Sequence, residues 1–214
     1  YVFSTKGRSH IDNAAQHIGK VPLIKTDIKK FYPSTTREMV LRFFREDLLC
    51  ATDIANILAD LCCFERRHLP TGSAISGYIA FLAAKPMFDR VEEMAIGEGC
   101  TMSTFVDDIA ISGASANMSL LLRVRRELRR HGFKTKSRKS RAYRAGQPKK
   151  LTGAVVTSAG LRLPNMQHKK IRATRLALAS TTVADLRTSL KARLRGQVDS
   201  ANQVLCHPGA FGLR

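Results

Sequence analysis

The sequence predicts an α+β protein with an antiparallel sheet, and three observations carry that prediction. The chain has 214 residues, of which 44% are hydrophobic and 25% charged, which is enough for a globular protein with a real core. Helical and strand-like patterns alternate without the regular strand–helix–strand rhythm of a parallel sheet. Short turn signals separate neighbouring strand-like runs, as they do in hairpins.

The first part of the chain predicts one strand followed by helices. Residues 21–28 form an apolar strand-like run, and Pro33 stops regular pairing after it. Thr35 and Glu38 have the spacing of a capping box, which predicts the start of a helix. Residues 53–63 predict a second helix from their apolar periodicity. Its inward face is expected to consist of Ile54, Ile57, Leu58 and Leu61.

The rest of the chain predicts two hairpins separated and followed by helices. Pro86 predicts a kink or a break in a long helical stretch that ends near residue 95. Residues 101–111 predict a hairpin with an Asp-Asp pair at its tip, and residues 118–130 predict a helix. Residues 151–163 predict a second hairpin. Two helices follow, and the later one is expected to turn inward Val183, Leu186, Leu190 and Leu194.

The charge of the chain is large and unevenly distributed. Lys and Arg total 36 against 17 acidic residues, a net charge of +19. Residues 1–122 carry 13 basic and 14 acidic side chains, whereas residues 123–150 carry 13 basic and one acidic. A segment so basic repels itself unless a polyanion lies along it, and nucleic acid is the polyanion that this pattern favours. A solvated face or an anionic membrane surface is the alternative.

The cysteine pattern indicates a reducing compartment. The five cysteines form no Cys-x-x-Cys pair, and an odd count is a poor disulfide framework. We therefore expect reduced, buried thiols in a cytoplasmic protein. No apolar run reaches the roughly 20 residues of a membrane span, so no membrane partner is expected. The chain begins at Tyr1 without a signal-peptide pattern, and we expect it to be a piece of a longer protein.

Three carboxylates suggest a metal site. Asp107 and Asp108 repel each other at a hairpin tip unless a cation neutralises them. Asp27 ends an apolar strand, and it can meet Asp107 if the two strands are neighbours. Carboxylate oxygens in a partly open cluster suit Mg²⁺, and two such ions can catalyse phosphoryl transfer. An isolated Asp-Asp pair is more often an ordinary turn, so the surrounding residues decide.

Those surrounding residues resemble the ordered motifs of bacterial reverse transcriptases, and within them the retron type. The resemblance covers about residues 6–165. The motifs that carry it are Asp27–Ser34, Leu69–Ser76, Phe105–Asp108, and Gly132-Phe133 followed by Lys139. Two segments are similar to retron proteins in particular, namely Asn13–His17 and Leu151–Gly153. Related defence-associated reverse transcriptases share similar segments.

The resemblance implies roles for individual residues. The catalytic group would be Asp27, Asp107, Asp108 and Lys139. The metal ligands would be Asp27, Asp107, Asp108 and the backbone carbonyl of Ile28. The nucleotide-binding group would be Arg8, Tyr32, Thr71 and Gly72, with Tyr32 excluding a ribose 2′-OH. The RNA-binding group would be Asn13, His17, Thr152 and Gly153.

Several of these roles have structural alternatives. The lysine near the pyrophosphate could be Lys134 or Lys136 instead of Lys139, because the family's asparagine is absent at position 136. Tyr32 could be a core aromatic, and His17 a structural histidine. The family's proline after the motif serine is replaced by Gly77, which leaves the template contact there open.

The resemblance also implies the architecture. It predicts a right-hand polymerase with an antiparallel-sheet palm, partial fingers and a short helical thumb. The fingers would comprise residues 1–26 and 34–68, the palm residues 27–33 and 69–165, and the partial thumb residues 166–214. The second predicted hairpin would be the primer grip, within the palm.

The implied function is RNA-directed DNA synthesis. The protein would extend a primer 3′-OH with dNTPs, using two Mg²⁺ ions with Mn²⁺ as a substitute. Its partners would be an RNA template, the RNA/DNA duplex, and a toxin or effector protein, and the template would be a cognate structured RNA in antiphage defence. One alternative is a defence-associated reverse transcriptase with another template or none. The other is a non-catalytic RNA-binding protein on a polymerase fold.

Overall fold

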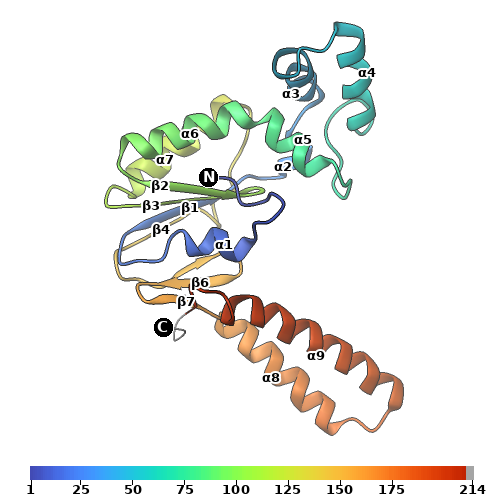
Figure 1. The fold of residues 1–214 in the computed structure, drawn as a ribbon, viewed down its shortest axis with the longest axis vertical. Coiled ribbons are helices and arrows are strands. Elements are labelled where there is room, and N and C mark those ends of the chain that lie inside the picture. The colour runs from blue at the N-terminus through green and yellow to red at the C-terminus, as the bar shows by residue number, and fades with distance from the viewer. Residues whose placement is uncertain (211–214) are drawn as a thin grey trace. The chain divides into compact units, whose positions relative to one another are not determined.

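The computed structural model describes residues 1–210, and the chain divides into two compact units (Figure 1). The first unit comprises residues 1–2 and 24–142, and the second comprises residues 3–23 and the chain from Tyr143 onward. The division into fingers, palm and thumb stays a prediction.

A four-stranded sheet forms the centre of the first unit. Its strands are β1 (Leu23–Asp27), β2 (Thr101–Phe105), β3 (Asp108–Ser112) and β4 (Arg141–Tyr143), in the order β2-β3-β1-β4. β2 and β3 are antiparallel, and Phe105 pairs with Asp108 at the end of their ladder. The hairpin predicted at residues 101–111 is therefore confirmed, and it lies beside the strand that ends in Asp27.

Helices α6 and α7 lie side by side over one face of this sheet (Figure 1). The helices of the unit are α2 (Phe31–Ser34), α3 (Arg37–Arg42) with a π-helical turn (Phe43–Asp47), α4 (Thr52–Cys62), α5 (Ser76–Ala83), α6 (Lys85–Gly97) and α7 (Met118–Arg130). Pro86 lies in the first turn of α6, directly after α5 ends, which confirms the predicted break. Gly132 has a positive φ of 83° just beyond α7 and ends it as expected.

An aromatic cluster connects the segment after β1 to helix α6 and to the residues that follow α7. The Phe31 ring lies 6.0 Å from that of Phe88 on α6 and 5.7 Å from that of Phe133. All three side chains are buried. Such contacts between aromatic rings add stabilisation beyond their buried area, so they hold the residues after Asp27 in a fixed place.

The structure corrects the predicted start of α3. Its N-cap is Thr36, whose hydroxyl accepts from the Met39 N–H, and not Thr35. The Thr35 hydroxyl instead donates to the Phe31 carbonyl. Thr35 is the C-cap of the short helix α2, so α3 begins one residue later than expected. Glu38 consequently has no capping-box partner at Thr35.

The predicted inward face of α4 is also wrong. Ile54, Ile57 and Leu61 are exposed by 47%, 56% and 77%, and Leu58 is half-buried. The buried residues of α4 are Ala55 and Ala59. Small residues four apart let α4 approach α3 closely, and the large side chains consequently point outward.

The second unit contains a short sheet, one short helix and a helical hairpin. Strands β5 (Lys149–Leu151), β6 (Ala154–Thr157) and β7 (Gly160–Arg162) pair antiparallel in that order. Helix α1 (His10–Ala15) contacts β6 and β7. Helices α8 (Asn165–Ser180) and α9 (Ala184–Leu205) pack against each other (Figure 1).

Two predictions in this unit need correction. The hairpin predicted over residues 151–163 begins only at Ala154, because Thr152 and Gly153 have φ values of 37° and 90° and turn the chain between β5 and β6. In α9 only Leu190 of the expected face is fully buried, while Val183 and Leu186 are exposed. Val183 and Leu186 lie at the tip of the helical hairpin formed by α8 and α9. They are exposed because α8 already ends at Ser180.

The five cysteines are all free, as expected. Cys63 and Cys100 are buried, but Cys206 is exposed, so the expectation of burial holds only in part. Within residues 1–210 there is no helix with the length and apolar character to cross a bilayer.

Gly113, which follows β3, permits a close approach to Cys100. A Cβ at this position would lie 2.9 Å from the Cys100 Cα, and φ is +156°. We expect Gly113→Ala to lower the free energy of unfolding by about 1–3 kcal/mol through overpacking, measured by chemical denaturation. Gly97→Ala is the matched control, because a Cβ at Gly97 meets nothing within 4 Å. Equal stability of the two variants would contradict the prediction.

Candidate active site

Asp27 and Asp107 come together because β1 and β3 are neighbours in the sheet. Asp27 is the last residue of β1 and is only 2% exposed. Directly after it, the Ile28 N–H donates to the Asp107 carbonyl oxygen at 2.9 Å. This backbone hydrogen bond joins the end of β1 to the loop between β2 and β3. The predicted meeting of the two aspartates across neighbouring strands is confirmed.

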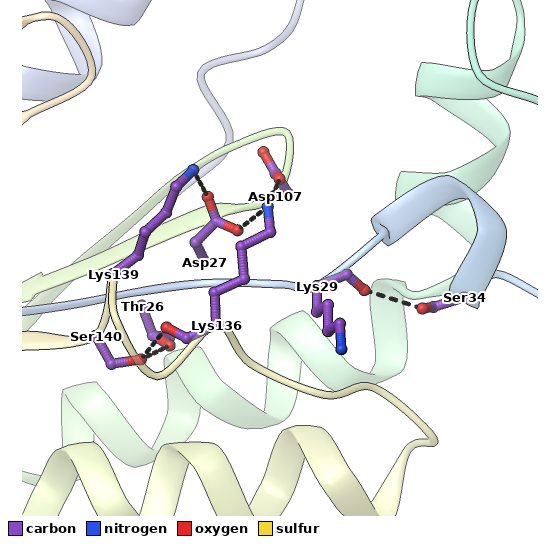
Figure 2. A network of polar contacts seen from close by, with 8 residues as sticks. All are labelled: Thr26, Asp27, Lys29, Ser34, Asp107, Lys136, Lys139 and Ser140. Atoms are coloured by element: carbon purple, nitrogen blue, oxygen red, sulfur yellow. Dashed lines mark hydrogen bonds and ion pairs between the residues drawn. The ribbon is translucent and has the colours of Figure 1, made fainter.

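Two lysines reach these carboxylates from residues 134–140 (Figure 2). The Lys139 Nζ donates to one Asp27 carboxylate oxygen at 2.6 Å. The Lys136 Nζ forms an ion pair with the other oxygen and lies 3.6 Å from Asp107 Oδ2. A single ammonium group thus stands between the two aspartates. The alternatives Lys136 and Lys139 both lie at the site, whereas Lys134 contributes its carbonyl to the Lys29 N–H.

Backbone contacts place the lysine segment against β1. The Lys136 N–H donates to the Asp27 carbonyl at 2.9 Å, and the Lys29 N–H donates to the Lys134 carbonyl at 2.7 Å. The hydroxyls of Thr26 and Ser140 also form a hydrogen bond, at 2.8 Å. Since these bonds bracket Asp27 on both sides, the two ammonium groups are held close to its carboxylate.

The charges around the site shift the pKa values of its groups in opposite directions. Burial alone would raise the pKa of Asp27, but the hydrogen bonds from Lys136 and Lys139 outweigh it and hold that pKa below its usual range. Burial and the nearby Asp27 charge raise the pKa of Asp107. Burial, Asp107 and Asp27 raise the pKa of Asp108 to about 6. The hydrogen bond to Asp27 raises the pKa of Lys139 and keeps it charged.

The donor set fits a divalent cation. Asp27 and Asp107 already share the positive charge of Lys136, so their oxygens converge on one cationic position. The negative field at Asp108 comes from the same two carboxylates. As the side chains stand, no three His, Cys, Asp or Glu groups within residues 1–210 are arranged around one metal position. A metal ion would therefore replace the ammonium of Lys136 between the carboxylates.

A cavity of about 520 Å³ opens beside the carboxylates. Tyr32, Thr71 and Asp107 line it together with Lys136, so it joins residues from separate motifs. This volume lies in the range of small-molecule sites. Gly72 is not among the lining residues, although its φ of 95° shapes the turn after Thr71.

Strained backbone borders this cavity on two sides. Val106 and Lys30 line it with φ values of 57° and 50°, in the left-handed region that non-glycine residues seldom adopt. Val106 is the first of two residues in the β2–β3 loop, where hairpins usually place glycine. Strain of this kind persists only where the surroundings hold it, and it gathers at functional sites. Here it sets the position of Asp107.

The predicted RNA-binding residues meet one another in the second unit. The Thr152 hydroxyl donates to the His10 carbonyl at 2.7 Å, and the Asn13 amide approaches that hydroxyl at 3.4 Å. Asn13 and His17 are 0% exposed, whereas Gly153 is exposed. The buried residues hold the Thr152-Gly153 turn against α1, so the exposed turn is the part that can meet a ligand. Arg8, in the same unit, lies over the Phe3 ring at 4.8 Å.

Sequence reasoning missed two residues that the structure makes prominent. Lys149 is fully buried, and its ammonium donates to the Gly19 carbonyl at 2.9 Å. It stands in a basic run, where nothing distinguishes it from solvated lysines. His68 lines the cavity beside Thr71, and a signal was available, because it lies directly before the Leu69–Ser76 motif.

Comparison with known proteins places this chain in a family. A family profile described as "Reverse transcriptase (RNA-dependent DNA polymerase)" matches residues 3–172. The retron Ec48 reverse transcriptase of Escherichia coli is 28% identical over 170 residues, covering 78% of this chain and 41% of that protein. The retron Ec86 reverse transcriptase of Escherichia coli is 27% identical over 172 residues, covering 78% and 52%. The chain therefore spans about half the length of these relatives or less.

Solved structures show the same fold. Telomerase from Candida albicans, in complex with a fragment of telomeric RNA, has a TM-score of 0.53 at 10% identity. The match covers 92% of this chain and 42% of that one. Apo telomerase from Candida tropicalis has a TM-score of 0.53 at 11% identity, covering 91% and 43%. The predicted polymerase fold with an antiparallel sheet is confirmed.

His17 predicts a pH dependence of stability. Burial, and then the charge of Lys149, lower its pKa to about 4, while an unfolded histidine titrates near 6.5. As the pH falls from about 6.5 to 4, the unfolded chain binds a proton that the folded chain does not. The contribution of His17 to the free energy of unfolding is therefore fully present above pH 6.5. It falls by up to about 3 kcal/mol as the pH drops to 4 and below.

We expect His17→Gln to flatten this part of the curve of unfolding free energy against pH, measured by denaturation between pH 7.5 and 4. The control is His168→Gln, which removes an exposed histidine from α8. Parallel curves for the wild type and His17→Gln over this range would contradict the assignment.

Proposed function

Because the chain belongs to the reverse transcriptase family, we propose that it extends a primer 3′-OH with dNTPs on an RNA template. The observation that carries the proposal is the Asp27–Asp107 pair, which shares one cationic group beside a cavity of about 520 Å³. Buried or half-buried carboxylates that converge on one position have no use in a passive scaffold, since they cost stability. They are what phosphoryl transfer requires.

The carboxylates would hold two Mg²⁺ ions, or Mn²⁺ in their place. When bound, these ions activate the attacking hydroxyl and stabilise the charge on the leaving pyrophosphate. Asp27, Asp107 and Asp108 supply the ligands, with the Ile28 carbonyl as a further one. Burial and the charges of Asp107 and Asp27 raise the pKa of Asp108 to about 6, so its carboxyl is mostly ionised at neutral pH, and a bound cation would relieve the repulsion among the three groups.

The two lysines have a role on the phosphate side of the cavity. Lys136 would give up its position between the carboxylates to a bound metal ion, whereas the contact with Asp27 raises the pKa of Lys139 and keeps it charged. The side chain of Lys139 is 58% exposed, so it can turn toward a triphosphate. Its ammonium would offset the charge of the leaving pyrophosphate or donate a proton to it.

Tyr32 and Thr71 would surround the sugar of the incoming nucleotide. Both line the cavity with Asp107, and Tyr32 is only partly buried. Burial and the charge of Asp107 raise the pKa of Tyr32, so its hydroxyl is neutral. An aromatic ring against the sugar leaves no room for a 2′-OH. Gly72, which shapes the turn after Thr71, belongs to the same proposed nucleotide group, and a nucleotide contact by Arg8 stays a prediction.

The proposed nucleic-acid partners are an RNA template and the RNA/DNA duplex. Support comes from the +19 charge and from the exposed Thr152-Gly153 turn in the second unit. The similarity to retron reverse transcriptases supports a cognate structured RNA as template, in antiphage defence. RNA contact by Asn13 and His17, a toxin or effector partner, and a cytoplasmic location stay predictions.

Primer extension tests the activity. We expect Asp107→Asn to lower extension on an RNA template with Mg²⁺ by at least about 100-fold, since even outer-shell changes at metal sites cost 10–100-fold. Asp53→Asn, at an exposed site on α4, is the control and should extend normally. Equal extension by Asp107→Asn and wild type would remove the catalytic assignment. Intact RNA binding without extension by wild type would favour the non-catalytic alternative.

Sugar selection tests Tyr32. We expect Tyr32→Ala to raise incorporation of ATP relative to dATP by on the order of 10-fold or more, because the ring no longer excludes the 2′-OH. The readout is the ratio of kcat/KM for the two nucleotides. Tyr78→Ala on α5, where the side chain is 58% exposed, is the matched control. An unchanged ratio in Tyr32→Ala would identify Tyr32 as a core aromatic only.

A further inference from the structure

A second cavity in the first unit is lined by cations. It has a volume of about 550 Å³ and lies between α7 and the residues that follow it. Its four basic lining residues are Lys29, Arg125, Arg129 and Lys134, and none of its described lining residues is acidic. We name these four residues and their cavity the α7 basic pocket.

The α7 basic pocket faces away from the carboxylates. The two cavities have no described lining residue in common. Lys30 and Lys136 line the cavity beside Asp107, whereas Lys29 and Ser137 line the basic pocket. Figure 2 shows the Lys29 side chain directed away from Asp27 and Asp107. A ligand in this pocket is therefore separate from a nucleotide at the carboxylates.

Neutral hydroxyl groups hold Arg125 in place. Its Nε donates to the Thr135 hydroxyl at 3.0 Å, and its Nη2 donates to the Ser137 hydroxyl at 3.2 Å. These bonds orient the guanidinium without cancelling its charge. They use two of its five N–H donors. The group is thus preorganised to receive an anion.

Other arginines on α7 have acidic partners. Arg123 pairs with Glu98, and Arg130 pairs with Glu127 at 3.1 Å. The arginines of α7 that have acidic partners are thus not among the pocket's lining residues, whereas Arg125 and Arg129 line it together with two lysines. Four positive charges around one cavity repel one another, which costs stability in the absence of an anion.

We propose that the α7 basic pocket binds phosphate groups of an RNA backbone at a place distinct from the catalytic carboxylates. Guanidinium groups suit phosphate because they donate in a planar fork, and lysines add point charges. The anionic nature of the ligand rests on the pocket alone. The choice of RNA rests on the proposed function, since a polymerase of this family meets RNA in every cycle.

The test compares two variants that change charge on the same helix. Arg125→Gln/Arg129→Gln removes two pocket cations, and Arg126→Gln removes an exposed arginine that does not line the pocket. The probe is a labelled RNA stem-loop without a primer terminus, titrated at several salt concentrations. We expect the double variant to raise Kd by about 10-fold or more. We also expect it to lower the salt slope by about 0.7–0.9 for each lost phosphate contact.

The control should shift Kd less than about 3-fold and keep the wild-type slope. Glutamine is a good helix former, so α7 should persist, and a denaturation curve verifies the fold of both variants. Thr135→Ala provides a second test that leaves every charge in place. It should weaken stem-loop binding by loosening Arg125.

Each outcome decides the proposal. Equal stem-loop binding by the double variant and Arg126→Gln overturns it, even if primer extension is normal. Pocket-dependent binding of inorganic phosphate, with stem-loop binding unchanged in the double variant, would identify a free-phosphate site instead. Pocket-dependent binding without primer extension by wild type would remove the proposed function and leave the pocket standing.

Discussion

The buried charge of Asp27 is the constraint on which the site depends. A carboxylate that is 2% exposed is costly unless cations meet it, and Lys136 and Lys139 both do. This requirement explains why residues 134–140 lie against β1, where backbone hydrogen bonds hold them on both sides of Asp27. It also supports the proposed metal site, because the protein already stabilises a positive charge between Asp27 and Asp107.

The rest of the first unit keeps this arrangement rigid. The β2–β3 hairpin brings Asp107 to Asp27 by placing β3 beside β1, and Val106 accepts a left-handed backbone at the tip. Behind the site, Phe31 is fixed by Phe88 and Phe133. Carboxylates at the ends of inner strands, supported by a packed aromatic cluster, lose little entropy when a ligand binds. The proposed chemistry therefore rests on packing as much as on charge.

The basic residues of the chain have different roles, depending on their partners in the fold. Lys136 and Lys139 neutralise carboxylates, and Lys149 is buried with a backbone partner. In the α7 basic pocket, two hydroxyl groups hold Arg125 and leave its charge in place. A net charge alone predicts a polyanionic partner but treats all of these groups alike. Their partners in the fold separate structural cations from those that can bind phosphate.

The sequence alone determined the fold class, the hairpin that carries Asp107, the break at Pro86 and the family, because these depend on local patterns and ordered motifs. The sequence also identified Asp27, because the end of an apolar strand is a local pattern. Only the tertiary structure decided that both Lys136 and Lys139 pair with Asp27, that α4 buries Ala55 and Ala59 and not its large apolar residues, and that Asn13 and His17 are interior. Each of these depends on contacts between residues far apart in the chain or on how closely two elements approach. Neither composition nor periodicity contains that information.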